Sequence, residues 1–350
     1  MDALANPPLT DARKTAHIKA VVTEAGQALR ARHPWLRHQD AIGVAILAFG
    51  LGGMLACAWL YSAGRIPAWL CIPLVALFAS LTHELEHDLI HWMYFRTTPW
   101  AHHAMMALVW LARPSTINPW IRRELHFHHH KHSGTASDRE ERGITNGEPW
   151  GLARVLMMGD LIVSMAVRVW RAPDRRQALR VLGRSLAVLF PLTFVHYGLW
   201  YAFLGFHLAD ALGRAAGAPI AWAPGTLAAM GVVDFLAVVW IIPNVLRGFC
   251  LHFVSSNMHY YGDVEDGNVV QQTQVLAPWW MAPFNLFCFN FGSTHAIHHF
   301  VVKEPFYVRQ ATAAEAHRVM REMGVRFDDL GTFRRANRWN EPGAGPAVAA

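Results

Sequence analysis

The stretch from Ala41 to Gly64 contains 24 residues without a charged side chain. A helix needs about 20 mostly apolar residues to cross the hydrocarbon core of a bilayer, so this stretch predicts a transmembrane span. The composition agrees, because 53% of the 350 residues are hydrophobic and only 16% are charged, less than in ordinary soluble domains. We therefore expect an integral membrane protein.

Three further apolar stretches complete an expected all-α integral membrane domain with about four transmembrane helices. The spans are expected near residues 41–64, 66–91, 185–209 and 225–250. They define a membrane domain at residues 41–310, between an N-terminal segment, 1–40, and a C-terminal tail, 311–350. Pro191 predicts a kink in the third span, because proline cannot donate the helical hydrogen bond.

The positions of the basic residues predict which parts of the chain face the cytoplasm. Lys and Arg are concentrated in both terminal segments and between the second and third spans, while the two other loops hold only Arg65 and Arg214. Because such residues favour the cytoplasmic side, both termini and a helical cap after the second span are predicted there, in a bacterial inner membrane. The formal net charge of +6 is then explained by anionic membrane lipid, and no nucleic-acid binding is expected.

Twenty-one histidines are present, and many of them fall in short clusters. The first cluster, His83-x-x-x-His87, places two imidazoles one helical turn apart at the end of the second span. The other two clusters share a different spacing, and they are His126-x-x-His129-His130 and His295-x-x-His298-His299. Residues at i, i+3 and i+4 lie on one helix face, so their ring nitrogens can converge. His259, just after the fourth span, is a further candidate at the same membrane face.

These nine imidazoles are too many for one tetrahedral zinc ion. They suit two metal ions, each with four or five nitrogen ligands and open positions for oxygen. Neutral imidazole binds iron as well as zinc, so the spacing alone does not select the metal.

Charged residues near the clusters suggest supporting roles. Carboxylates can orient an imidazole by accepting its second ring N–H, and the candidates are Glu84, Glu86, Asp88, Glu124, Asp263 and Asp266. Arg122 and Arg123 precede the second cluster and are candidates for an anionic head group. Ordinary cytoplasmic positive charge is the alternative for both arginines.

The three clusters together resemble the membrane fatty acid desaturase and alkane hydroxylase superfamily, whose mark is HxxxH followed by two HxxHH motifs. The resemblance covers roughly Leu51 to Pro305. It implies a non-haem diiron site at the cytoplasmic ends of four transmembrane helices, over a hydrophobic substrate tunnel. The implied ligands of the two iron ions are His83, His87, His126, His129, His130, His259, His295, His298 and His299. No catalytic side chain is expected beyond these ligands.

The resemblance implies an oxidoreductase that uses O2 to oxidise an unactivated C–H bond of a long-chain fatty acid, acyl or hydrocarbon substrate. Desaturation is the first expectation, while hydroxylation and decarboxylation of a free fatty acid to a terminal alkene remain open. Such chemistry needs a redox metal. Because the sequence has no flavin, haem or iron–sulfur motif, an external ferredoxin-, rubredoxin- or cytochrome-like electron donor is expected.

Two alternatives belong to other functional classes. His83-Glu84-x-x-His87 also matches the motif of zinc metalloproteases, in which Glu84 would be the general base. That hypothesis leaves both HxxHH clusters unexplained. A metal transporter would need ligands near the middle of the membrane, whereas these clusters lie at the ends of the expected spans.

Overall fold

The computed structural model describes residues 9–145 and 147–340, and in these ranges the chain is all-α, without a β-strand. The first helices in the chain are α1 (Asp11–Arg32), α2 (Gln39–Ser62), α3 (Ala68–Ile90), α4 (Pro99–Ala112), α5 (Pro119–His132) and α6 (Arg139–Ile144). The next are α7 (Leu152–Gly159), α8 (Leu161–Trp170), α9 (Arg175–Leu189), α10 (Leu192–Ala215), α11 (Pro224–Leu236) and α12 (Ile242–Met258). The last are α13 (Val269–Gln272), α14 (Ala282–Phe287), α15 (Phe291–Phe300), α16 (Phe306–Ala311), α17 (Ala313–Glu322) and α18 (Thr332–Arg335).

Three helical segments among the described residues are long and apolar enough to cross a membrane. They are α2, α3 and the segment Pro224–Met258, in which the π-helical residues Ala237–Ile241 join α11 to α12. A fourth is counted if the bent pair α9 and α10 is taken as one span. The predicted all-α class is therefore confirmed, and the described residues contain three candidate spans, or four with the bent pair, against the expected four.

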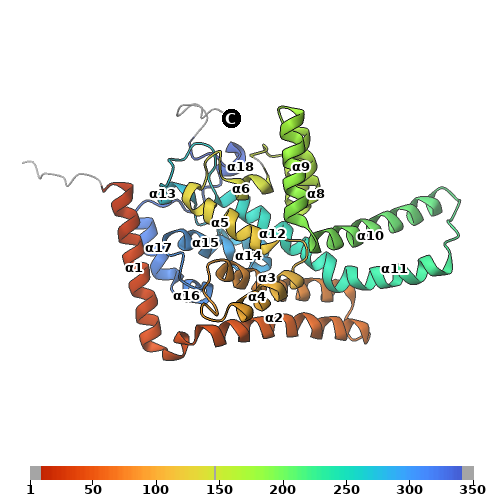
Figure 1. Ribbon diagram of the computed structural model, residues 1–350, viewed down its shortest axis with the longest axis horizontal. Helices are drawn as coiled ribbons and strands as arrows, with labels where there is room; N and C mark the ends of the chain where they lie inside the picture. Colours follow the sequence, from red (N-terminus) through yellow and green to blue (C-terminus); the bar gives the residue numbers. More distant parts are fainter. Residues whose placement is uncertain (1–8, 146, 341–350) are drawn as a thin grey trace, which may run out of the picture.

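The third predicted span, 185–209, is not one straight helix. α9 ends at Leu189, α10 begins at Leu192, and their axes differ by 96°. Pro191 lies at the break, where it cannot donate a helical hydrogen bond and disfavours helical geometry in the preceding residue. The expected kink is thus a sharp bend, and α8 and α9 stand across the direction of α10 and α11 (Figure 1).

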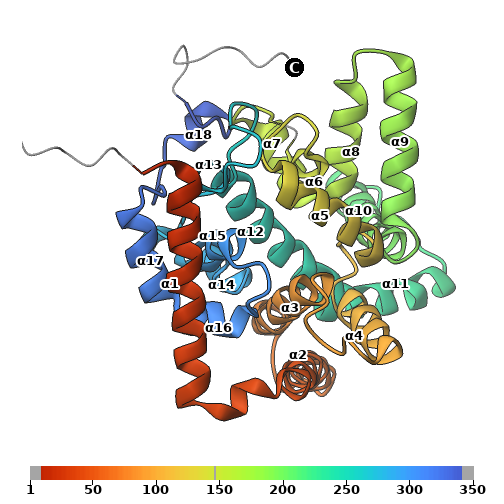
Figure 2. The same cartoon turned by 60° about the vertical axis from the view of Figure 1, so that its left-hand side comes forward.

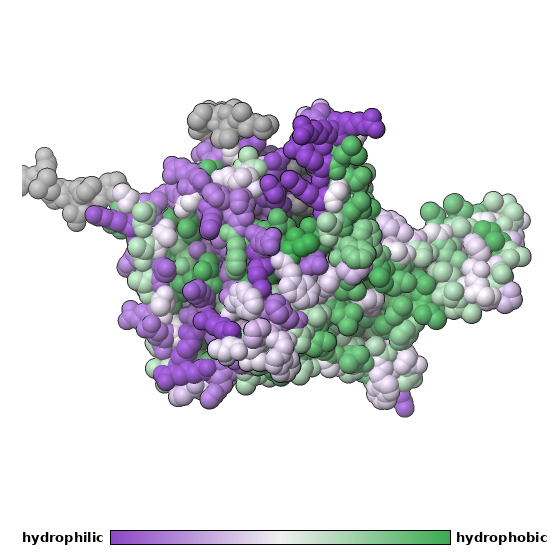
Figure 3. Space-filling model, in the orientation of Figure 1, coloured by the Kyte–Doolittle hydropathy of each residue, from purple (hydrophilic) through white to green (hydrophobic). Residues whose placement is uncertain are grey.

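The candidate spans leave much apolar surface uncovered. On α2, Leu55 is 71% exposed and Trp59 is 66% exposed. Hydrophobic residues also cover the projecting α10–α11 pair and the adjoining flank of α8 and α9, while hydrophilic residues dominate the opposite side of the same view (Figure 3). Exposed apolar patches of this kind are typical of surfaces that contact a membrane or another protein.

α3 is the central helix, and every residue from Ala79 to Ile90 is buried. One core lies between α2, α3 and α4, and another joins α1, α12, α15 and α17. Figure 2 shows α1 running along α17 on the outside of this second core. The guanidinium of Arg309 on α16 lies 3.5 Å from a Glu84 oxygen and 3.2 Å from an Asp88 oxygen, so a buried ion network fixes α16 against α3.

Candidate metal centre

The clustered histidines come from four separate parts of the chain. α3 carries His83 and His87 and ends next to His91, while His259 directly follows α12. α5 and α15 each present three histidines at i, i+3 and i+4. α5 is well defined at its start, since Pro119 occupies its first turn and the Asn118 side chain accepts a hydrogen bond from the backbone N–H of Trp120. Asparagine is a favoured N-cap and proline a favoured first residue.

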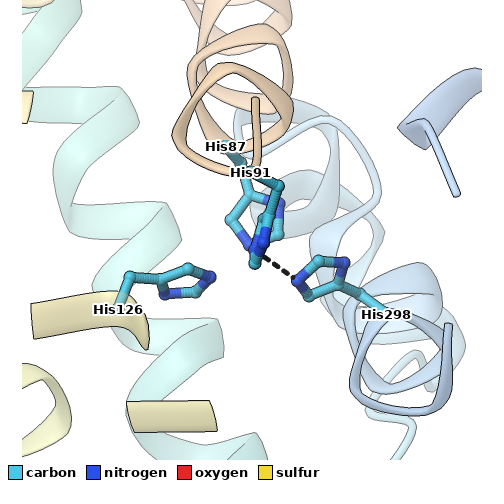
Figure 4. A group of neighbouring side chains, drawn as sticks. All are labelled: His87, His91, His126 and His298. Carbon is cyan, nitrogen blue, oxygen red and sulfur yellow. Dashed lines mark hydrogen bonds between the residues drawn. The ribbon is translucent and has the colours of Figure 1, made fainter. Parts of the chain in front are cut away.

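Four rings form what we call the first histidine group, and its members are His87, His91, His126 and His298. One ring nitrogen of each lies within 4.8 Å of those of the other three. Figure 4 shows the rings pointing toward one another from α3, α5 and α15. Both ring nitrogens of His87 are buried without a hydrogen-bond partner among the described residues. Buried polar atoms rarely lack a partner, so the ring of His87 is suited to act as a metal ligand.

The spacing of the ring nitrogens fits coordination of one ion. His298 Nε2 lies 3.0 Å from His91 Nε2 and 3.0 Å from His130 Nε2, and His130 Nε2 lies 3.1 Å from His126 Nε2. Two ligands at a right angle, each bound at about 2.1 Å, are separated by about 3.0 Å. His130 therefore adjoins the first histidine group and brings it to five imidazoles.

The second histidine group consists of His129, His259, His295 and His299, whose ring nitrogens also lie within 4.8 Å of one another. All four side chains are buried. His259 Nε2 and His299 Nε2 have no hydrogen-bond partner among the described residues. Their Nδ1 atoms lie 3.0 Å from Ser255 O and from Gln272 Oε1, respectively, and these contacts hold the rings in place.

The two groups adjoin each other. The ring centroids of His129 and His130 are 5.8 Å apart, and those of His87 and His295 are 5.3 Å apart. Nine imidazoles thus surround two neighbouring positions, with five around the first and four around the second. Two adjoining groups of imidazoles are the ligand arrangement of a two-metal site.

Eight of the nine histidines predicted from the sequence lie in or beside these groups, but His83 lies in neither. His91 occupies the expected place of His83. The sequence contains two overlapping HxxxH patterns, 83–87 and 87–91, and the structure brings the second to the other clusters. Four residues advance a helix by about 6 Å, so His83 lies a full turn too far along α3 to join the first group.

Three acidic residues around α6 support the centre, and sequence reasoning did not single them out. Asp138 Oδ2 lies 2.8 Å from His129 Nδ1, and Glu140 Oε2 lies 2.7 Å from His126 Nδ1. Glu141 Oε1 lies 3.4 Å from His259 Nδ1. The signal was the run Asp138-Arg139-Glu140-Glu141, shortly after the second cluster. A carboxylate on Nδ1 fixes the ring so that Nε2 faces the metal.

The charged residues suggested from the sequence have other partners. Glu84 and Asp88 pair with Arg309, and Glu86 pairs with both Arg113 and Arg122. Asp266 contacts His132, and Asp263 accepts the backbone N–H of Trp339 and Asn340. The interpretation of Arg122 and Arg123 as ligands of an anionic head group stays a prediction, and both arginines also have partners within the protein. Arg122 also pairs with Glu140, while Arg123 donates to the carbonyls of Leu89 and Ile90.

Burial and charge set the protonation of these rings. Burial lowers the pKa of His126, His130, His295, His298 and His299 well below the usual value. A neutral imidazole is the form that binds a metal. Burial also opposes the charged form of His129, but the charges of Asp138, Glu140 and Glu141 outweigh this and raise its pKa to about 9. Asp138 thereby makes His129 the most basic ring of the second group.

Replacing Asp138 with asparagine is expected to weaken metal binding about 10- to 100-fold, the usual effect of losing a carboxylate that orients a ligand. The amide keeps the size of the side chain but removes its charge. Metal retention during titration with a chelator measures the change. Replacing Asp266 with asparagine is the matched control, because that carboxylate is exposed and pairs with His132, which is in neither histidine group. Equal retention in the two variants would contradict the assigned role.

A cavity of about 850 Å³ adjoins both groups. Its wall includes six histidines, which are His83, His126, His129, His252, His259 and His295. Apolar residues from α5, α8, α9 and α12 line much of the rest, among them Ile121, Leu161, Val181 and Leu251. Charged residues, among them Arg139, Arg168 and Arg180, line the other part of the wall. The volume lies in the range of small-molecule sites, and a cavity with an apolar part and a charged part suits an amphipathic molecule.

The zinc-protease hypothesis requires His83 and His87 to share one ion. The structure places His87 with His91, His126 and His298, whereas His83 Nδ1 lies 3.2 Å from a guanidinium nitrogen of Arg113. Glu84, the general base in that hypothesis, faces Arg309 instead. The geometry therefore disfavours this alternative.

Comparison with known protein families gives a match that covers the candidate metal centre. The family model for fatty acid desaturase matches residues 63–331, which is more than half of the chain and includes all of the histidines of both groups. No curated protein matches the sequence at a significant level. The chain belongs to the fatty acid desaturase family.

Proposed function

We propose that the protein uses O2 to oxidise an unactivated C–H bond of a long-chain fatty-acyl or related lipid substrate, with desaturation as the reaction. The observation that carries this proposal is the pair of adjoining histidine groups beside an apolar cavity, in a chain of the fatty acid desaturase family. Members of this family are oxidoreductases known for diiron centres.

The first histidine group together with His130 would hold one iron ion, and the second group would hold the other. Two irons bound there would supply the O2-dependent redox chemistry that side chains alone cannot perform. The distances of 3.0 to 3.1 Å between the ring nitrogens of the first group support this assignment.

The remaining residues position the ligands and the substrate. Asp138, Glu140 and Glu141 orient rings of both groups. The apolar residues of the cavity wall would hold the chain beside the centre, because a hydrocarbon gains free energy on leaving water. The protein would thus contribute ligands, orientation and an apolar surface for the chain.

We place the protein in a membrane, with the metal centre and both termini on the cytoplasmic side. The uncovered apolar surface of α2, α10 and α11 supports this placement. α9 exposes Arg176, Arg180 and Arg184 at four-residue spacing, a basic face suited to anionic lipid head groups or to an acidic electron donor. An external donor of the ferredoxin, rubredoxin or cytochrome type would supply the electrons.

The test combines metal analysis with product analysis. Protein purified in detergent is expected to hold about two irons per chain, as a two-metal oxygenase does. With a reductase system and O2, mass spectrometry of the added fatty acids is expected to reveal unsaturated products. Alcohols or terminal alkenes would instead assign hydroxylation or decarboxylation to the same centre. A single zinc ion and no O2-dependent product would contradict the proposal.

A further inference from the structure

His83 lines the same cavity as both histidine groups but belongs to neither group. Its side chain is 1% exposed, and its ring lies 5.7 Å from that of Phe291, which in turn stacks on His295 at 4.0 Å. His83 is thus separated from the second group by one aromatic ring. The HxxxH motif predicted His83 as a metal ligand, so its buried imidazole needs another role in this position.

The contact with Arg113 determines where the ring of His83 carries its proton. A guanidinium can only donate hydrogen bonds, so His83 Nδ1 accepts from Arg113, and the proton of the neutral ring is on Nε2. Arg113 is itself held by a buried ion pair with Glu86. His83 Nε2 has no hydrogen-bond partner among the described residues. His83 therefore presents an N–H donor rather than a lone pair for a metal.

Arg247 on α12 is a second buried residue with donors that lack a partner among the described residues. It is fully buried, and its Nε donates to Asn244 Oδ1 at 3.3 Å. Neither of its terminal nitrogens has a hydrogen-bond partner within the described ranges, 9–145 and 147–340, and no carboxylate there pairs with it. A buried charge is costly unless it is paired, so this guanidinium is suited to an anion that the protein itself does not provide.

The two donors belong to one region beside the cavity. Arg247 lies one helical turn before Leu251, which lines the cavity wall. Asn244, which accepts from Arg247 Nε, donates to the carbonyl of Ala112, and the next residue, Arg113, contacts His83 Nδ1. Unpartnered donors of His83 and Arg247 in this one region have the chemistry of an oxyanion site.

We infer that His83 and Arg247 bind the carboxylate of a free long-chain acid beside the metal centre. This inference rests on the proposed function, because it assigns the polar end of the proposed substrate. A carboxylate has two oxygens that accept several hydrogen bonds, and its charge offsets that of Arg247. An alcohol or an ester of the same chain offers no such charge, so the site selects free acids.

The test measures binding without turnover, in nanodiscs of phosphatidylcholine. Dodecanoic acid is compared with dodecan-1-ol and methyl dodecanoate by calorimetry. His83→Leu and Arg247→Leu are each expected to lower the affinity for the acid about tenfold or more, as the loss of a charge-assisted hydrogen bond does. The affinity for the alcohol is expected to stay unchanged. His83→Gln and Arg247→Lys, which keep a donor or the charge, are expected to recover part of the affinity for the acid.

Two further readouts separate this role from a structural one. His83→Leu is expected to keep two irons per chain, because His83 lies outside both groups. Arg247→Leu is expected to retain or raise the melting temperature without ligand, since it removes an unpaired buried charge. His128→Leu is the control for both measurements, because His128 lies within the second cluster but belongs to neither group and bonds to Ser137 instead.

Each remaining outcome has a defined meaning. Loss of iron in His83→Leu, or unchanged affinity for the acid in both leucine variants, would overturn the inference. If the wild-type protein selects the acid but holds no iron and oxidises nothing, the proposed function fails while the carboxylate site stands. If the wild-type protein oxidises chains but binds acid and alcohol equally, the proposed function stands while the carboxylate site fails.

Discussion

Replacing His298 with alanine is expected to reduce C–H oxidation to background and to remove iron from the first histidine group. His298 Nε2 lies 3.0 Å from Nε2 of both His91 and His130, so it occupies the middle of this set of ring nitrogens. Removing a central ligand leaves the ion without a complete set. Iron per chain and product yield, measured on the same preparation, check the result.

His91→Ala is expected to give the same loss, although the first HxxxH pattern of the sequence does not include it. His128→Ala is the matched control, because this histidine lies between His126 and His129 on α5 and yet joins neither group. Full activity of His298→Ala, or equal loss in His128→Ala, would sink the assignment of the first group.

Replacing Glu86 with glutamine is expected to lower the free energy of unfolding by about 3–5 kcal/mol, the usual cost of breaking a buried ion pair from one side. Glu86 and Arg113 are both fully buried and in contact, and a second Glu86 oxygen lies 2.9 Å from Arg122. The amide would leave Arg113 buried without a counter-charge. Denaturant titration in detergent measures the change.

The matched control for this prediction is Glu315→Gln. Glu315 also pairs with an arginine, Arg318, but both side chains are about half exposed. Exposed ion pairs contribute little to stability because water screens them. No measurable change is expected in this variant, and an equal loss in both would show that burial is not what makes the Glu86 pair important.

Much of the metal centre follows from helical periodicity. The i, i+3 and i+4 spacing predicts from the sequence alone that the histidines of 126–130, and likewise those of 295–299, share one helix face. Periodicity does not choose between the overlapping pairs 83–87 and 87–91, since both have the same spacing. That choice depends on how far α3 extends toward α5 and α15, which is a property of tertiary packing.

The carboxylates that orient the histidines, and the bend between α9 and α10, also depend on tertiary structure and were harder to predict. Asp138, Glu140 and Glu141 reach the histidines because the chain turns back after α5, and their sequence alone resembles an ordinary solvated charged run. Hydropathy located the apolar stretch at 185–209 but carries no directional information. The 96° change of axis at Pro191 therefore became visible only in the structure.

Both metal positions need residues of α15 in addition to residues of α3 or α5. His298 completes the first group, and His295 and His299 complete the second. During biosynthesis, neither position exists until the ribosome has released residue 299 and α15 has docked. Metal binding is then expected only after α15 has docked, and a chain that ends before α15 is expected to retain no metal at either position.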